Sequence, residues 1–257
     1  MNKENLKFKD STVFEGMTSI RSILRGIESG NNSRNITEII YDEAKYNKIA
    51  KELGYLKAVS DKFGFHITKS NAEEIDKLTL GTTHGGLVAI ATDRDIPYLS
   101  ADDEIENNGF YCMIQGIEDP YNFGYALRSL YACGCSGIIL TERNWMSAAG
   151  VVARSSAGAS ELFKIYRSTA SDAVDIFKNK GYSIVCAHEK TENVLGKCEL
   201  PLPLFLVVGG EKRGISQDVI DKTDILVKIN YAREFRASLS AASAATIFAY
   251  EISRQNF

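Results

Sequence analysis

Short apolar runs alternate with segments of helical periodicity along the C-terminal part of the chain, from Phe110 onward. Six runs are rich in β-branched and aromatic residues and have the length of strands: FYCMIQGI, SGIILTE, ELFKIYR, YSIVCAH, LFLVVGG and DILVKI. Helical patterns such as YNFGYALRSLYACG and TASDAVDIFKNKG separate several of them, and SLSAASAATIFAYEISRQ predicts a long final helix. Strands that alternate with helices require crossover connections. We therefore expect an α/β fold with a mostly parallel sheet covered by helices on both faces.

The N-terminal part mixes short helical and strand-like pieces. The segment EGMTSIRSILRG has helical spacing of apolar residues, and Gly26 can close that helix. NITEIIYD and GLVAIAT are predicted as strands, and YNKIAKELGYLKAVSDKFG as a helix. We expect a small α/β domain over residues 1–92, a linker with a solvated run of acids over 93–108, and a second domain over 109–257.

The composition is that of an ordinary globular protein, with 257 residues, 44% hydrophobic and 25% charged. No apolar run approaches the ~20 residues of a membrane span, and MNKENLKFKD does not have the pattern of a signal peptide. We therefore expect a cytoplasmic protein that does not enter a membrane. The five cysteines form no C-x-x-C pair and only three histidines accompany them, so we expect reduced thiols and no metal site.

The net charge of −3 argues against a protein that coats nucleic acid with a wholly basic surface. Residues 1–92 carry a formal charge of +1 and the remainder carries −4. A polyanion must therefore bind to a local patch, and the N-terminal part is the better candidate.

Three loops are candidates for chemistry, because ligands of open parallel sheets bind beyond the C-terminal ends of the strands. The first loop is QGIEDPYNFGYALRS, in which Asp119 and Pro120 can start a helix. It also contains Asn122 and Arg128, six residues apart. Arg128 lies close to an apolar stripe, so it needs a partner or an anionic ligand.

The second loop, LVVGGEKRGIS, ends a strand in two glycines, followed by a charged triplet and a third glycine. Its spacing fits neither the dinucleotide pattern G-x-G-x-x-G nor the phosphate loop G-x-x-x-x-G-K-[ST], which disfavours a nucleotide-dependent oxidoreductase. Glycines at this place let a ligand approach the backbone closely. A tight turn with a solvated tip explains them without a ligand.

The third loop, INYAREFRASLSAAS, leads from a strand into the final helix. Ser238 is predicted as the N-cap of that helix. The many alanines and serines that follow allow another backbone to pack very closely against it.

In this order and with these spacings, the three loops resemble the three motifs of the SpoU/TrmH family of RNA ribose methyltransferases. GIEDPYNFGYALRSLYACGCSGIIL is similar to the first motif, VVGGEKRGIS to the second, and VKINYAREFRASLSAASAATIFAYEISRQ to the third. RSSAGASELF also matches the family between the first two. The resemblance covers about residues 110–255, and the part that ends in THGGLVAIA resembles the small substrate-binding domain that many members carry in front.

The resemblance implies a SPOUT fold with a C-terminal trefoil knot, a homodimer formed through the knotted domain, and S-adenosylmethionine as cofactor. It assigns the catalytic roles to Asn122, Arg128, Glu211 and Ser238. The residues expected to bind the cofactor are Val208, Gly209, Gly210, Ile229, Ser238 and Leu239. The expected partner is RNA, and the candidate RNA-binding residues are Arg128, Arg154, Arg233 and Arg236.

Methyl transfer to a ribose 2′-hydroxyl requires oxygen, methyl and sulfur in line and the removal of one proton. A guanidinium is effectively never deprotonated in proteins. Our hypothesis is therefore that Arg128 stabilises alkoxide character on the ribose oxygen as it forms.

The sequence departs from the family in its third motif. Ser240 stands where the family usually has asparagine, and Asn230 and Tyr231 replace the usual Pro-Met. The two-domain layout is more similar to members that act on 23S ribosomal RNA than to those that act on tRNA. A tRNA 2′-O-methyltransferase and a non-catalytic RNA-binding relative stay open as alternatives.

Overall fold

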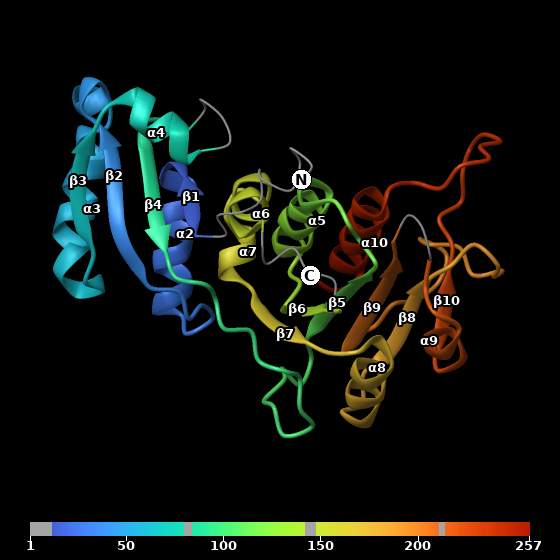
Figure 1. The fold of residues 1–257 in the computed structure, drawn as a ribbon. Coiled ribbons are helices and arrows are strands. Elements are labelled where there is room, and N and C mark those ends of the chain that lie inside the picture. The colour runs from blue at the N-terminus through green and yellow to red at the C-terminus, as the bar shows by residue number, and fades with distance from the viewer. Residues whose placement is uncertain (1–11, 80–83, 142–147, 211–213) are drawn as a thin grey trace, which may run out of the picture. The chain divides into compact units, whose positions relative to one another are not determined.

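The computed structural model describes residues 12–79, 84–141, 148–210 and 214–257. The chain forms two compact units (Figure 1). Unit 1 consists of Met1–Asp95 together with Trp145–Leu162, and unit 2 consists of Ile96–Asn144 together with Phe163–Phe257.

Unit 2 is built on a parallel sheet, which has six strands within the described residues, in the order β10-β8-β9-β5-β6-β7. The strands are β5 (Phe110–Gln115), β6 (Gly137–Leu140), β7 (Lys164–Arg167), β8 (Ser183–Ala187), β9 (Leu204–Gly209) and β10 (Ile225–Val227). Each lies within one of the six apolar runs. The prediction of an α/β fold with a mostly parallel sheet is therefore confirmed, whereas the knot stays a prediction.

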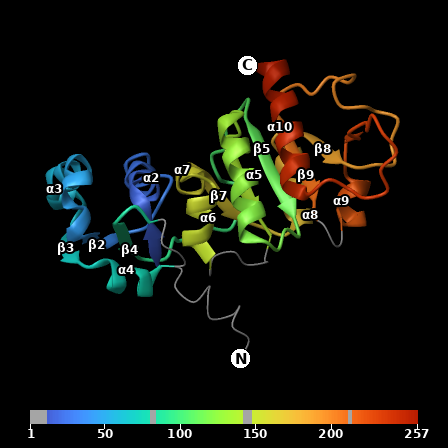
Figure 2. The same cartoon turned by 90° about the horizontal axis from the view of Figure 1, so that it is seen from above.

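Helices cover both faces of this sheet. Helices α5 (Pro120–Ala132) and α10 (Ala241–Asn256) pack against each other on one face, and α8 (Ala170–Asn179) and α9 (Gln217–Asp221) lie on the other (Figure 2). On the α8 side, the ring of Phe177 stacks on that of Phe205, with centroids 4.2 Å apart. Such aromatic stacking fixes the position of α8 on the sheet.

The segment expected as a linker is packed along unit 2 from Ile96 onward. The backbone N–H of Leu99 donates to the carbonyl oxygen of Arg167 over 2.8 Å, and that of Arg167 donates to Pro97 over 2.8 Å. The guanidinium of Arg167 lies over the ring of Tyr98 and donates to the carbonyl of Ile96. These contacts extend the sheet by one short parallel bridge beyond β7.

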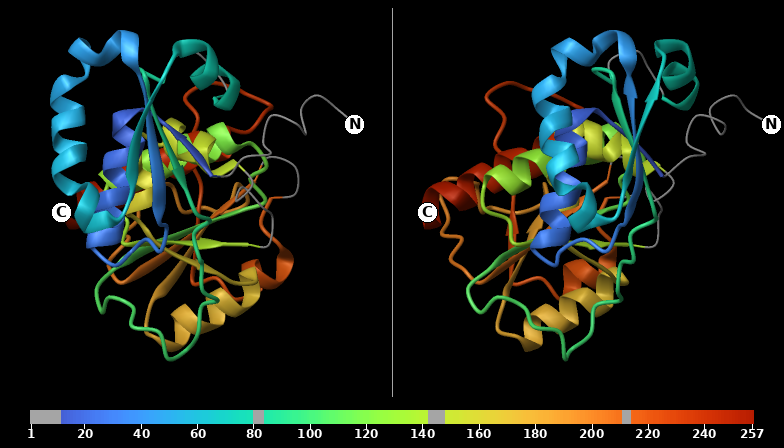
Figure 3. Two further views of the ribbon diagram at one scale, coloured as in Figure 1. Left: turned by 60° about the vertical axis from the view of Figure 1, so that its left-hand side comes forward. Right: turned by 90° about the vertical axis from the view of Figure 1, so that its left-hand side faces the viewer.

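Unit 1 contains a mixed sheet of order β1-β4-β2-β3, counted over its described residues. Its strands are β1 (Val13–Glu15), β2 (Ile36–Asp42), β3 (His66–Ser70) and β4 (Leu87–Ala91). Helices α2 (Gly16–Glu28) and α3 (Ala50–Phe63) lie on one face, and α4 (Ala72–Leu78) lies on the other (Figures 2 and 3). A short 3-10 helix, η1 (Glu43–Lys48), precedes α3. The predictions of β2, β4 and α3 are confirmed, while β1, β3 and α4 were not predicted.

Two helices from the middle of the chain, α6 (Ala149–Ser155) and α7 (Ala159–Leu162), also belong to unit 1. Glycines allow them to approach closely: a Cβ at Gly150 would lie 2.1 Å from the carbonyl oxygen of Val13, and one at Gly26 would lie 2.1 Å from that of Glu161. The expectation that Gly26 closes its helix is wrong, because α2 continues to Glu28. Gly26 is needed for close packing. The expected domain boundaries stay a prediction, but unit 1 takes residues that the sequence analysis placed in the second domain.

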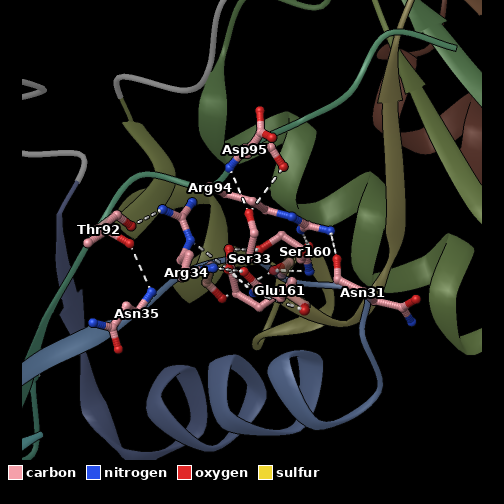
Figure 4. Close-up of polar contacts among 12 residues, drawn as sticks. Asn31, Ser33, Arg34, Asn35, Thr92, Arg94, Asp95, Ser160 and Glu161 are labelled. Atoms are coloured by element: carbon pink, nitrogen blue, oxygen red, sulfur yellow. Dashed lines mark hydrogen bonds and ion pairs between the residues drawn. The ribbon is translucent and has the colours of Figure 1, made fainter. Parts of the chain in front are cut away.

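A buried polar network holds α7 in unit 1 (Figure 4). Nε of Arg34 donates to Oε2 of Glu161 over 2.9 Å, and the side-chain amide of Asn32 donates to the same oxygen over 2.7 Å. Arg94 donates to the backbone carbonyls of Ser160 and Asn31. Burial raises the pKa of Glu161, but the charges of Arg34 and Arg94 outweigh it and the pKa is lowered. The network therefore contains a buried carboxylate held ionised between two guanidinium groups.

None of the helices in the described part of the chain combines the length and hydrophobicity that a membrane crossing needs. The described residues also contain no group of three or more His, Cys, Asp or Glu side chains arranged to hold a metal ion. The five cysteines are free thiols.

Candidate functional site

The candidate site lies at the edge of the unit 2 sheet where its parallel strands end. β5 and β9 are neighbours, and their last residues, Gln115 and Gly209, are paired in register. The loop after β5 is the first candidate loop and the loop after β9 is the second. β10 leads into the third, on the same edge beyond β8. The parallel sheet thus brings the ends of all three motif strands to one edge.

The two glycines after β9 are required by the chain itself. The N–H of Gly210 donates to the carbonyl oxygen of Gln115 over 2.6 Å, and a Cβ at Gly210 would lie 2.4 Å from the carbonyl oxygen of Gly116. A Cβ at Gly209 would lie 2.9 Å from Cα of Gly214. The N–H of Gly214 donates to the carbonyl oxygen of Gly210 over 3.2 Å and closes the turn, hereafter the glycine corner. The tight-turn interpretation therefore explains Gly209 and Gly210.

Two other glycines leave room for a ligand. Gly116 and Gly214 have positive φ angles of +81° and +63°, and apart from chain neighbours no described atom lies within 4 Å of a Cβ at either position. Gly116 is half-buried and Gly214 is exposed, so main-chain atoms at these two glycines reach the surface. This fits a ligand held by main-chain groups, such as the cofactor that the resemblance implies. Val208 is buried within β9, so its contact with the cofactor stays a prediction.

A side-chain clasp that the sequence analysis missed joins β5 to the glycine corner. The backbone N–H of Ser216 donates to Oε1 of Gln115 over 3.1 Å, and Nε2 of Gln115 donates to the Ser216 hydroxyl oxygen over 3.1 Å. The N–H of Ser216 is only a donor, so the orientation of the amide is fixed by chemistry. The Ser216 hydroxyl also hydrogen-bonds to the carboxylate of Asp218 and lowers the pKa of that acid. In the sequence, this clasp is indicated only by Gln115, a polar residue at the end of an apolar strand.

Helix α5 begins just after β5 and carries the first-motif residues. The carboxylate of Asp119 accepts the N–H of Tyr121 over 2.7 Å, and Pro120 takes the first helical position, as predicted. Asn122 is half-buried in the first turn, whereas Arg128 is exposed and makes no ion pair with any described residue. Arg128 is therefore a cation available to an anionic ligand.

The third loop differs from its prediction at the start of the helix. The cap is Ser240, whose hydroxyl oxygen accepts the N–H of Ser243 over 3.2 Å. The expectation that Ser238 is the N-cap is wrong, because α10 begins at Ala241 and Ser238 lies two residues before the cap. Ser238 is exposed, and Leu239 is half-buried, as is Ile229. Because Ser240 caps α10, the predicted capping role does not account for Ser238.

The remaining candidate residues fall in different environments. Arg154 lies in unit 1, where its guanidinium donates to the carboxylate of Glu15 over 2.6 Å, so it already has an anionic partner. Arg233 and Arg236 are exposed in the third loop of unit 2. Glu211 lies outside the described residues. The catalytic, cofactor-binding and RNA-binding roles of all these residues stay predictions.

Comparison with known proteins gives a family for this arrangement. The model of the SpoU rRNA Methylase family matches residues 109–250. YacO of Bacillus subtilis, named as a TrmH family tRNA/rRNA methyltransferase, is 27% identical over 202 residues, which are 77% of this chain and 80% of YacO.

Solved structures share the fold. An RNA 2′-O ribose methyltransferase superposes with a TM-score of 0.74 at 19% identity, over 95% of this chain and 88% of the other. An AdoMet-bound rRNA methyltransferase from Sinorhizobium meliloti superposes with a TM-score of 0.76 at 21% identity, over 95% and 87%.

Proposed function

The chain belongs to the SpoU rRNA Methylase family of RNA methyltransferases, and from this premise we propose that it transfers a methyl group from S-adenosylmethionine to the 2′-hydroxyl of a ribose in structured RNA. The observation that carries the proposal is the meeting of the ends of all three motif strands at one sheet edge, where the corner backbone is accessible beside β5. A structural neighbour named as a 2′-O ribose methyltransferase and another named as AdoMet-bound support the chemistry.

The chain's own residues would bind and orient the reactants. Main-chain groups at Val208, Gly209 and Gly210, with Ile229 and Leu239 across the edge, hold the cofactor, which supplies the methyl group. Asn122 at the start of α5 and Ser238 before α10 offer hydrogen bonds to the ribose. Glu211 is proposed as the acid of the second motif.

Arg128 carries the electrostatic role. Its exposed guanidinium, which has no ion pair within the described residues, contacts the reacting ribose and a neighbouring phosphate. There it stabilises the negative charge that develops on the 2′-oxygen. It keeps its own proton, so the ribose proton leaves to another acceptor.

The substrate is proposed to be 23S ribosomal RNA rather than tRNA, because residues 1–92 precede the methyltransferase part as in members of that kind. An RNA substrate of this class places the enzyme in the cytoplasm. Residues 1–92 are proposed to bind this RNA. Tyr121 and Tyr125 on α5 and Ile247 and Tyr250 on α10 are exposed apolar side chains on two helices that pack together. We propose that a second copy covers them in a homodimer.

The test is transfer of labelled methyl groups to bulk RNA that lacks the modification. Alkaline hydrolysis then maps the product, because a 2′-O-methyl group removes the nucleophile that cleaves the adjacent phosphodiester. Label in one alkali-resistant ribose of 23S RNA supports the proposal. Label in tRNA would redirect the substrate, and label in a base would contradict 2′-O chemistry. RNA binding without cofactor uptake would favour the non-catalytic relative.

A further inference from the structure

The third loop presents two aromatic rings to solvent. Between β10 and α10 (Figure 1), Tyr231 is 38% exposed and Phe235 is 59% exposed. Their ring centroids lie 6.1 Å apart with the planes tilted by 59°. Two adjoining exposed rings form a small apolar surface, and covering it with a ligand is favourable.

The loop is anchored at both ends, and one of its rings is tied to a candidate site residue. The N–H of Leu239 donates to the hydroxyl oxygen of Tyr231 over 3.2 Å and ties the end of the loop to its beginning. Before the loop, the N–H of Lys228 donates to the carbonyl oxygen of Asn193 over 2.9 Å. After it, Ser240 caps α10. The two rings therefore lie on a closed loop whose last residues, Ser238 and Leu239, are candidate site residues.

The same loop carries two arginines that serve no evident structural purpose. The side chain of Arg236 is 95% exposed, and it pairs at 4.0 Å with Glu234, whose side chain is 87% exposed, so the contact contributes little to stability. Arg233 is exposed and has no ion pair within the described residues. Flat rings beside cations match the chemistry of an RNA strand, whose bases stack on aromatic side chains and whose phosphates pair with arginine.

We propose that Tyr231 and Phe235 form a stacking platform for an unpaired base close to the methylated nucleotide, and that Arg233 and Arg236 bind the phosphates on either side of it. This inference rests on the proposed function. A base inside an A-form helix is already stacked and cannot offer its face. The platform therefore selects a target in a loop, bulge or single-stranded segment of RNA over the same sequence in a duplex.

The first test compares variants in binding a short mixed-sequence single-stranded RNA and the duplex formed with its complement. Phe235→Ala weakens single-strand binding about 5- to 150-fold, the usual loss when one stacking ring is removed. Phe235→Trp retains single-strand binding because it keeps a flat ring, and Phe235→Leu loses it although it stays apolar. Duplex binding changes little in any of them. Phe257→Ala is the matched control, since Phe257 is a 77% exposed ring elsewhere in unit 2.

The second test uses salt. For a single strand, log affinity falls with log salt, and Arg233→Gln and Arg236→Gln each make this negative slope shallower by about 0.7. This is the value expected for one lost phosphate contact. A slope unchanged in both variants contradicts the phosphate role.

The outcomes separate this inference from the proposed function. Wild-type methylation with Phe235→Ala at the same KM for RNA overturns the platform and leaves the enzyme intact. A Phe235→Ala variant that changes oligomeric mass but not RNA affinity also overturns it, because the rings then bind protein. Failure of the wild type to take up S-adenosylmethionine overturns the proposed function, while the comparison of single strand with duplex still decides the platform.

Discussion

Two pairs of arginines, one pair in each unit, occupy opposite environments. In unit 1, Arg34 and Arg94 are 4% and 6% exposed; Arg34 pairs with the carboxylate of Glu161, and the charge of Arg94 lowers the pKa of that acid (Figure 4). In unit 2, Arg128 and Arg233 are exposed and have no ion pair within the described residues. A guanidinium removed from water must be paired, and once paired it cannot bind an anionic ligand. Burial and pairing, rather than the residue type, therefore separate the structural cations from the cations available to an anionic ligand.

The largest effect is expected from removing the anion of the buried network. Glu161→Gln leaves two buried guanidinium groups without their counter-charge, so the free energy of unfolding falls by about 3–5 kcal/mol. Urea denaturation of the full chain measures this. Glu28→Gln is the control, because Glu28 pairs with Lys62 at the surface of the same unit and its loss changes stability little. Equal effects of the two variants would show that the network does not depend on its buried charge.

The same network predicts how stability depends on pH. The pKa of Glu161 is lowered in the folded protein, so its contribution is fully present above the pKa of an unfolded glutamate, about 4.3. This contribution is lost as the pH falls further, through the lower pKa of the folded state. In thermal melts from pH 7 to pH 3, the wild type therefore loses more stability below about pH 4 than Glu161→Gln does. Parallel curves for the two proteins would contradict this.

In unit 2, removing an exposed arginine is expected to lower the methylation rate without changing the stability of the fold. Arg128→Ala lowers kcat about 10²- to 10³-fold, the cost of removing one donor to a developing oxyanion. Arg128→Lys restores the charge but not the planar fork, so it recovers only part of the rate. Melting temperatures stay at the wild-type value. Arg34→Lys is the matched comparison. Because Arg34 is buried, we expect this variant to have a lower melting temperature. Wild-type turnover by Arg128→Lys contradicts the proposed role.

The clasp at the glycine corner predicts an intermediate effect that depends on pH. In the variant Gln115→Glu, the introduced carboxylate and that of Asp218 compete for the single hydroxyl proton of Ser216, which costs about 1–3 kcal/mol. The folded state then favours the protonated form of the introduced acid and raises its pKa. The variant is therefore as stable, and binds the cofactor as tightly, as the clasp allows at low pH. Both properties weaken as the pH rises through the raised pKa of the introduced acid.

Isothermal titration of Gln115→Glu with S-adenosylmethionine at several pH values measures this effect. The control is Gln115→Met, because it removes both hydrogen bonds of the clasp without adding a titratable group, so the loss that it causes does not vary with pH. In Gln115→Glu, a loss of affinity that does not vary with pH would argue against the clasp.

The smallest effect is expected at the cap of α10. Ser240→Ala loses about 1 kcal/mol of stability, whereas Ser240→Asn keeps the cap, because asparagine and serine are equally good at this position. Ser240→Asn also introduces the amide usual in the family, so its methylation rate tests whether that amide acts on the reactants. Thermal melts and initial rates of the two variants give the answer. A stable but slower Ser240→Asn enzyme would show that serine is required there for more than capping.

Local sequence patterns determined the strands of unit 2 and the loops that carry its motifs. A strand such as β9 needs only a run of apolar residues long enough to cross a buried sheet, and the residues of LFLVVGG contain that information themselves. The cap at Asp119 and the helix start at Pro120 are equally local. The Asp119 carboxylate accepts hydrogen bonds from the backbone two and three residues further on, and proline suits the first helical position. The position of the candidate site followed from these elements and the geometry of a parallel sheet.

Tertiary structure decided which residues are paired, and it decided the composition of unit 1. Gly26 lies within a helix whose pattern looked complete, but its reason lies 135 residues away in the carbonyl of Glu161. The clasp between Gln115 and Ser216 spans 101 residues, and Ser240 rather than Ser238 caps α10. The periodicity of a sequence reports which face of an element is apolar. It does not report which distant backbone comes close enough to exclude a Cβ or to neutralise a charge, because those contacts depend on the packing of the whole chain.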